Sequence, residues 1–78
     1  MKGRQKGGLM PTMDAVKIGG NLRRLRESRL LTQAELGSAA GVHRDQVSRI
    51  ERDEVEPRFS TIKKLAAALE VDPSELTK

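Results

Sequence analysis

Side chains that could carry out catalysis are scarce in this sequence. It contains one His and no Cys among 78 residues, which excludes thiolate ligands and leaves too few groups for a zinc site. The sequence shows no nucleophile–base pattern, no cluster of metal ligands and no phosphate-binding loop. We therefore expect no enzyme, no metal and no cofactor.

The residues that could act by binding gather in one short stretch, 44–52. Val47 and Ile50 are the apolar positions of a predicted helix there, and its outward face is polar. That face consists of Arg44, Asp45, Ser48, Arg49 and Arg52. An ordinary three-helix bundle explains the apolar positions, but it does not explain why so short an exposed face is rich in Arg.

The charge of the chain is unevenly distributed. Residues 1–31 carry eight Lys and Arg against two acids, whereas residues 53–78 carry four bases and six acids. The chain as a whole has a formal net charge of +4. A basic surface of this kind fits a polyanionic partner, and it equally fits a solvated face. Charge alone leaves both interpretations open.

Two short helices and a turn position the polar face. Thr32 and Glu35 form a capping box that starts a helix over 32–40, and Gly41 ends it in the left-handed conformation. His43 is placed to cap the following helix at its N-terminus. This arrangement is the spacing of a helix-turn-helix, whose second helix enters a DNA major groove.

Three further helices complete the predicted domain. Ile18, Leu22 and Leu25 recur at helical spacing, which predicts a helix from about Asp14 to Arg29. Another helix starts at Phe59 or Ser60. Its predicted inward face is Ile62, Leu65, Ala66 and Leu69. The pair formed by Asp72 and Pro73 starts a short last helix.

The chain divides into two parts. Residues 1–13 contain three Gly and few apolar residues, which predicts a flexible basic arm or a cloning leader. Residues 14–78 form the expected domain. No apolar run is long enough to cross a membrane, and no secretory signal is present, so we expect a cytoplasmic protein without a membrane partner.

The ordered set of motifs across residues 17–76 resembles the XRE family, the Cro and lambda-type phage repressor group of helix-turn-helix proteins. The matching stretches are Ile18-Gly19, 22–27 (LRRLRE), 31–36 (LTQAEL), 40–42 (AGV), 47–51 (VSRIE), Pro57, Ile62, Leu65-Ala66, Ala68-Leu69 and Val71. The resemblance implies an all-α, five-helix lambda-repressor-like DNA-binding domain with its recognition helix at about 44–52.

The resemblance also implies roles in DNA binding. The positions that match base-reading residues are Arg44, Asp45, Ser48 and Arg49. The positions that match contacts to the DNA backbone are Thr32, Gln33, His43, Arg58 and Phe59. The plain alternative for each charged position is a solvated side chain. For His43 it is a helix cap, for Phe59 a place in the core, and Asp45 could instead orient Arg44 or Arg49.

Two further roles follow from the resemblance. Arg26 and Glu51 match a structural pair that joins the first helix to the end of the recognition helix. Val71, Pro73 and Leu76 have few obvious partners inside the domain, and they match positions where family members dimerise. We expect a homodimer through residues 70–78.

Three positions depart from the family pattern. Leu30 stands where Gly is common, at a helix C-terminus that requires positive φ, and a non-glycine residue there costs about 1–2 kcal/mol. Gly37 replaces the usual Ala. The loop 53–56 is acidic, which weakens the case for its contact with phosphate.

The expected function is sequence-specific DNA binding by a transcriptional regulator, most simply a repressor that binds a pseudo-palindromic operator as a dimer. One alternative is an antitoxin that binds both a toxin and its own operator. Another is a structural adaptor that uses the fold without binding DNA.

Overall fold

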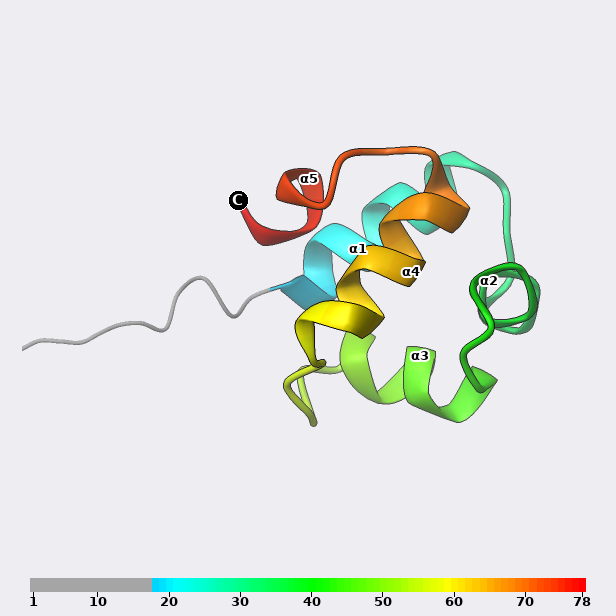
Figure 1. Cartoon of the computed structure of the whole chain (residues 1–78). Helices are drawn as coiled ribbons and strands as arrows, with labels where there is room; N and C mark the ends of the chain where they lie inside the picture. The colour runs from blue at the N-terminus through cyan, green and yellow to red at the C-terminus, as the bar shows by residue number, and fades with distance from the viewer. Residues whose placement is uncertain (1–17) are drawn as a thin grey trace, which may run out of the picture.

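The structure, a computed structural model, describes residues 18–78. These residues form helices and no strand, as Figure 1 shows. The helices are α1 (Ile18–Ser28), α2 (Gln33–Ala40), α3 (Arg44–Glu51), α4 (Phe59–Leu69) and α5 (Ser74–Thr77). The predicted five-helix, all-α fold is confirmed. The arm expected at 1–13 and the cap expected at Asp14 lie outside the described residues. Each helix within 18–78 is too short or too polar to span a membrane.

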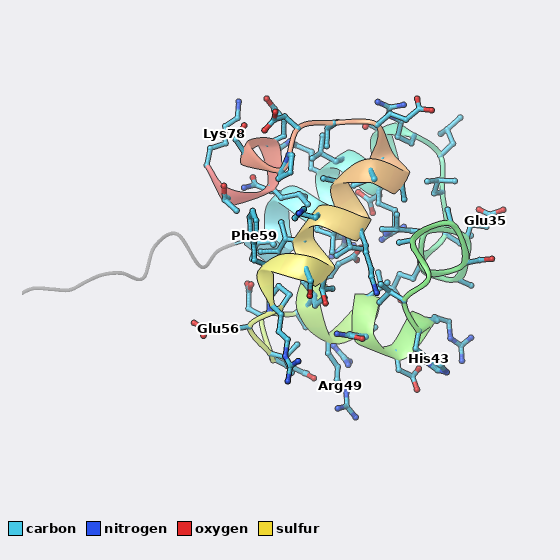
Figure 2. All side chains as sticks on the ribbon, in the orientation of Figure 1. Glu35, His43, Arg49, Glu56, Phe59 and Lys78 are labelled. Atoms are coloured by element: carbon cyan, nitrogen blue, oxygen red, sulfur yellow. The ribbon has the colours of Figure 1, made fainter. Side chains whose placement is uncertain are left out.

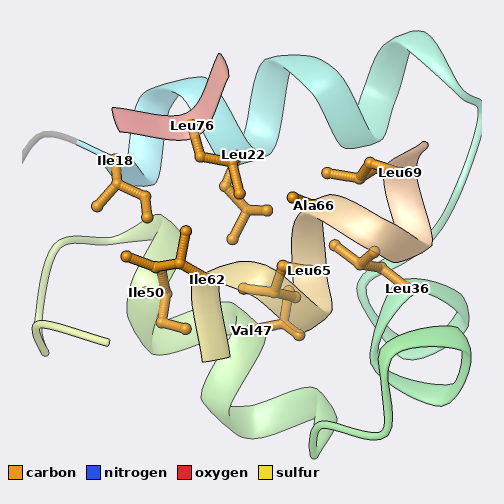
Figure 3. Close-up of a cluster of buried hydrophobic side chains, with 10 residues drawn as sticks. All are labelled: Ile18, Leu22, Leu36, Val47, Ile50, Ile62, Leu65, Ala66, Leu69 and Leu76. Atoms are coloured by element: carbon orange, nitrogen blue, oxygen red, sulfur yellow. The ribbon is translucent and has the colours of Figure 1, made fainter. Parts of the chain in front are cut away.

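One hydrophobic core holds the helices together, and every helix contributes to it (Figure 3). Its buried members are Ile18, Leu22, Leu36, Val47, Ile50, Ile62, Leu65, Ala66, Leu69 and Leu76. The inward faces predicted for α3 and α4 are confirmed. α4 runs through the middle of the bundle, with α3 along one edge and α5 along the opposite edge (Figure 1). The polar face of α3 is therefore left free on the outside.

Glycine allows the start of α1 to approach the end of α3 closely. A Cβ on Gly19 would lie 2.5 Å from the carbonyl oxygen of Ile50 and 2.8 Å from that of Glu51. Gly20, in contrast, faces open space. Gly19 therefore positions α3 against α1, a role that helix propensity alone does not reveal.

α1 ends at Ser28, one residue before the predicted end. Leu30 then adopts φ 58°, the left-handed conformation expected at this position, and its side chain is 89% exposed. The amide of Leu31 donates to the carbonyl of Arg26 at 3.2 Å, which closes the helix end. Leu30 thus carries the strain of positive φ without any compensating burial.

α5 is part of the core, and this corrects one expectation. Leu76 is fully buried, and the side-chain amide of Asn21 on α1 donates to its carbonyl at 2.9 Å. The expectation that Leu76 has few partners inside the domain is wrong, because α5 folds back onto α1. At the start of α5, the amide of Ser74 donates to Asp72 at 3.0 Å and lowers the pKa of that carboxyl below its ordinary value.

The alternative of a core position for Phe59 is wrong. This first residue of α4 is 64% exposed, and its contact with the DNA backbone stays a prediction. The helix turns Ile62, three residues later, inward instead. The ammonium of Lys63 lies 5.8 Å from the centre of the Phe59 ring, within the range of a cation–π contact.

Candidate nucleic-acid interface

Both ends of α2 are capped as the sequence predicts. The Thr32 hydroxyl accepts the Glu35 amide at 3.0 Å, and the Glu35 carboxylate accepts the Thr32 amide at 2.8 Å, which completes the capping box. Gly41 ends α2 at φ 73°. Together these contacts fix both ends of α2, the helix on which the start of α3 rests.

Gly37 sets the distance between α2 and the turn. A Cβ at this position would lie 2.5 Å from the carbonyl oxygen of Val42 and 3.3 Å from the backbone nitrogen of Arg44. The Ala that is usual here would therefore push the turn away. In this structure, the absence of a Cβ at Gly37 permits the close approach of the turn to α2.

A buried ion pair braces α3 from behind. Arg26 Nε donates to Glu51 Oε2 at 2.6 Å and Arg26 Nη2 to Glu51 Oε1 at 3.0 Å. The side chain of Glu51 is 3% exposed and that of Arg26 is 11% exposed. This hydrogen bonding raises the pKa of Arg26 above its ordinary value. The expected contact between Arg26 and Glu51 is present, and it links α1 to the last residue of α3.

The same ion pair also holds the chain around α2. Arg26 Nη1 donates to the carbonyl of Leu31 at 2.8 Å, just before the capping box. Gln33 Nε2 donates to Glu51 Oε1 at 3.0 Å. Gln33 therefore has a structural contact that the sequence did not predict. A carboxylate that accepts from both Arg26 and Gln33 fixes the start of α2 relative to the end of α3.

The outward face of α3 presents its charged groups to solvent. Arg44, Asp45 and Arg49 are exposed and Ser48 is half-buried. Arg44 Nε lies 3.8 Å from Asp45 Oδ1, so Asp45 is near enough to orient Arg44. Figure 2 shows Arg49 and His43 extending outward from the edge of the molecule that α3 forms. These side chains offer both donors and acceptors to a partner.

His43 caps α3, as the sequence predicts. Its ring nitrogen Nδ1 accepts the backbone amide of Asp45 at 3.1 Å. The imidazole is 75% exposed. A free amide at the first turn of α3 is thereby satisfied, and the ring lies at the rim of the same outward face.

A groove of about 470 Å³ runs between α3 and the segment that leads into α4. Its lining residues are His43, Asp45, Gln46, Arg49, Val55, Glu56, Pro57, Arg58 and Thr61. Sequence reasoning missed Gln46 and Thr61. Gln46 could have been found, because it lies three residues before Arg49 on the same helix. Thr61 could not, because its place depends on how α4 approaches α3.

The acidic loop contributes both signs of charge to this groove. Arg52 Nε lies 3.3 Å from Glu54 Oε2, and this ion pair neutralises one carboxylate of the loop. Glu56 and Arg58 line the groove together. Arg58 is the N-cap of α4 and its side chain makes no capping bond. Arg58 is therefore available to a ligand, with Glu56 beside it as a counter-charge.

Residues 18–78 contain no group of three or more side chains able to hold a metal ion. A charged helix face with a groove along its side is open to solvent. Such a surface matches a polyanion that presents both phosphates and hydrogen-bonding edges.

Comparison with known proteins identifies relatives over most of the chain. The family described as Helix-turn-helix (HTH_3) matches residues 22–76. An immunity repressor protein of Bacillus phage phi105 is 34% identical over 59 residues, which cover 76% of this chain and 41% of that protein. The chain thus spans about two fifths of the length of this curated relative.

Solved structures resemble the fold closely. The restriction-modification controller protein C.AhdI of Aeromonas hydrophila is 38% identical, with a TM-score of 0.77, over 83% of this chain and 98% of that one. The P22 c2 repressor, solved in complex with a synthetic operator, is 34% identical, with a TM-score of 0.73, over 78% and 92%. The chain belongs to the XRE-type helix-turn-helix family of DNA-binding transcriptional regulators, the group of the Cro and lambda-type repressors.

Proposed function

We propose that this protein is a sequence-specific DNA-binding repressor that acts as a dimer on a pseudo-palindromic operator. The observation that carries the proposal is the outward face of α3. Arg44, Asp45 and Arg49 are exposed there, while the buried pair of Arg26 and Glu51 holds the helix behind them. A rigid support of this kind is what base reading requires.

The side chains divide into two groups by role. Arg44 and Arg49 read guanine through O6 and N7, and Asp45 accepts from cytosine N4. Ser48 contributes a shorter contact from its half-buried position. The groove beside α3 receives the sugar–phosphate backbone. Thr32, Gln33, His43, Arg58 and Phe59 are the proposed backbone contacts, and Gln46 and Thr61 join them because they line the groove.

The proposed dimer uses the C-terminal segment without Leu76. Val71 and Pro73 are half-buried, so each retains apolar surface for a second copy. One recognition helix reads only a few base pairs, and two linked helices give useful affinity and a symmetric site. The arm at 1–13 adds basic charge near the DNA in this proposal.

Selection of bound DNA from a random pool tests the function directly. We expect an enriched motif with two inverted half-sites about 10 bp apart, centre to centre. Binding without any enriched sequence would leave only the electrostatic attraction of a basic protein. Absence of binding even at low salt would overturn the proposal and favour the adaptor.

A further inference from the structure

We propose that His43 is a positioning residue that couples base reading to the protonation of its own imidazole ring. The neutral imidazole holds the first turn of α3, and the protonated imidazole releases it. The inference rests on the proposed DNA-binding function, because the turn concerned carries Arg44 and Asp45. It goes further, since it makes the specificity of binding depend on pH.

The capping bond requires one protonation state of the ring. His43 Nδ1 accepts the amide of Asp45 at 3.1 Å, and an imidazole nitrogen accepts only through a free lone pair. The proton of the neutral ring is therefore on Nε2. This tautomer leaves an N–H donor on the side of the ring away from Nδ1. One ring thus caps the helix and presents a donor to an acceptor on DNA.

Protonation changes the partner of Nδ1. A protonated Nδ1 is a donor, so it can no longer accept the Asp45 amide. Oδ2 of the Asp45 carboxylate lies 3.9 Å from Nδ1, and Oδ1 of the same carboxylate lies 3.8 Å from Arg44 Nε. The imidazolium draws the carboxylate toward itself and away from Arg44. Both changes occur in the turn that carries two of the proposed base readers.

Among the charged groups near His43, the Asp45 carboxylate is the one that responds most directly to protonation of the ring. Asp45 and Arg49 of α3 line the groove together with His43, as do Glu56 and Arg58 of the segment that leads into α4. Arg44 follows His43 in the chain, and its Nε lies 3.8 Å from Asp45 Oδ1. Within residues 18–78, Asp45 is the acidic partner within 4.0 Å of the ring. The added positive charge attracts any DNA, whereas the loosened turn harms recognition of the operator. The ratio of operator affinity to random-DNA affinity therefore falls as the ring gains its proton.

The experiment compares this ratio at about pH 7.2 and about pH 5.5, the interval in which histidine side chains titrate. His43 is the single His of the chain, so its imidazole signals are readily assigned. We expect the ratio to fall about fivefold in the unmodified protein, the effect of losing one N-cap bond. In His43→Asn the side chain caps without titrating, so the ratio stays constant. In His43→Ala it stays constant at the lower value.

Nuclear magnetic resonance of the free protein tests the switch without DNA. The ring nitrogens should show the Nε2–H tautomer at about pH 7.2, and the Asp45 amide should shift and lose exchange protection as the ring is protonated. The inference is overturned if the Asp45 amide signal does not change when the ring is protonated. It is also overturned if the pH dependence of the affinity ratio persists in His43→Asn. If no DNA binds at either pH, the proposed function fails, and the amide titration still decides the switch.

Discussion

The buried ion pair is the residue-scale feature that most constrains the interface. Removing one partner of a buried pair leaves an uncompensated charge, at a cost of about 3–5 kcal/mol. Because Glu51 is 3% exposed, Arg26→Ala should lower the free energy of unfolding by that amount, measured with urea. Arg23→Ala is the matched control. Its partner Glu27 is 55% exposed, so its loss should stay below about 1 kcal/mol. Equal losses would contradict the buried role.

The proposed base-reading residues make different predictions from the proposed backbone contacts. Arg44→Ala or Arg49→Ala should each cost about 1–3 kcal/mol of operator binding and relax the preference at one base pair, because a base-reading Arg discriminates between bases. Fluorescence anisotropy with the operator and with its single-base variants measures both effects.

Arg58→Ala is the comparison for a backbone contact. It should weaken operator and random DNA by similar factors, since phosphates carry no sequence. Arg58 serves better here than Gln33, whose amide also holds Glu51. Equal losses on both DNAs for the Arg44 and Arg49 variants would reassign these two residues to the backbone.

Much of the candidate site could be predicted from the sequence, residue by residue. The capping box, the His43 cap and the pair of Arg26 and Glu51 depend on local spacing or on a matching motif, and all these contacts are present. The expectation of few partners for Leu76 and the core alternative for Phe59 were wrong. Leu76 lies in the four-residue α5, where too few positions exist for periodicity to define a face. Phe59 is the first residue of α4, where Ile62 and not Phe59 turns into the core.

At the scale of the helices, replacing individual glycines with Ala distinguishes the effect of helix propensity on stability from the effect of helix packing. Gly20→Ala should raise the free energy of unfolding by up to about 1 kcal/mol, because its Cβ meets open space and Ala favours the helix. Gly19→Ala and Gly37→Ala should lower it despite the same gain in propensity, because each Cβ would lie 2.5 Å from a backbone carbonyl oxygen. Urea unfolding of the three variants measures this. A higher free energy of unfolding for all three variants would mean that the helices can move apart to accommodate the added Cβ.

The end of α1 contains strain that one substitution removes. Leu30→Gly should stabilise the domain by about 1 kcal/mol, because Gly adopts φ 58° without the cost of a side chain. Little packing is lost, since the Leu30 side chain is 89% exposed. Thermal unfolding should shift upward by about 4–8 °C. An unchanged or lower melting temperature would show that Leu30 contributes an interaction that offsets its strain.

At the scale of the whole molecule, the elements have separate tasks. α1 and α4 supply much of the core, α2 supports the turn, and α3 exposes its polar face along one edge (Figure 1). The sequence predicted this arrangement through the order of its motifs. It could not predict the approach of α4 to α3, which forms the groove, because that distance depends on contacts between residues far apart in the chain.

The placement of α5 makes a prediction about assembly. With Leu76 inside the core, Val71 and Pro73 are the remaining apolar residues of the proposed dimer interface. Pro73→Glu places a charge there without removing a buried side chain, so the monomer should keep its melting temperature while the dimer weakens. Sedimentation should show a lower association constant, and operator binding should require more protein.

The spacing of half-sites provides the complementary test, because a two-fold dimer presents its recognition helices to one face of the duplex. Half-sites about 10 bp apart, centre to centre, satisfy this geometry. Inserting about 5 bp between them turns the second half-site to the opposite face of the DNA, so affinity should fall to that of a single half-site. Replacing the central bases without changing their number should have a much smaller effect. Full affinity after the insertion, or one protein chain per intact operator, would contradict the dimer.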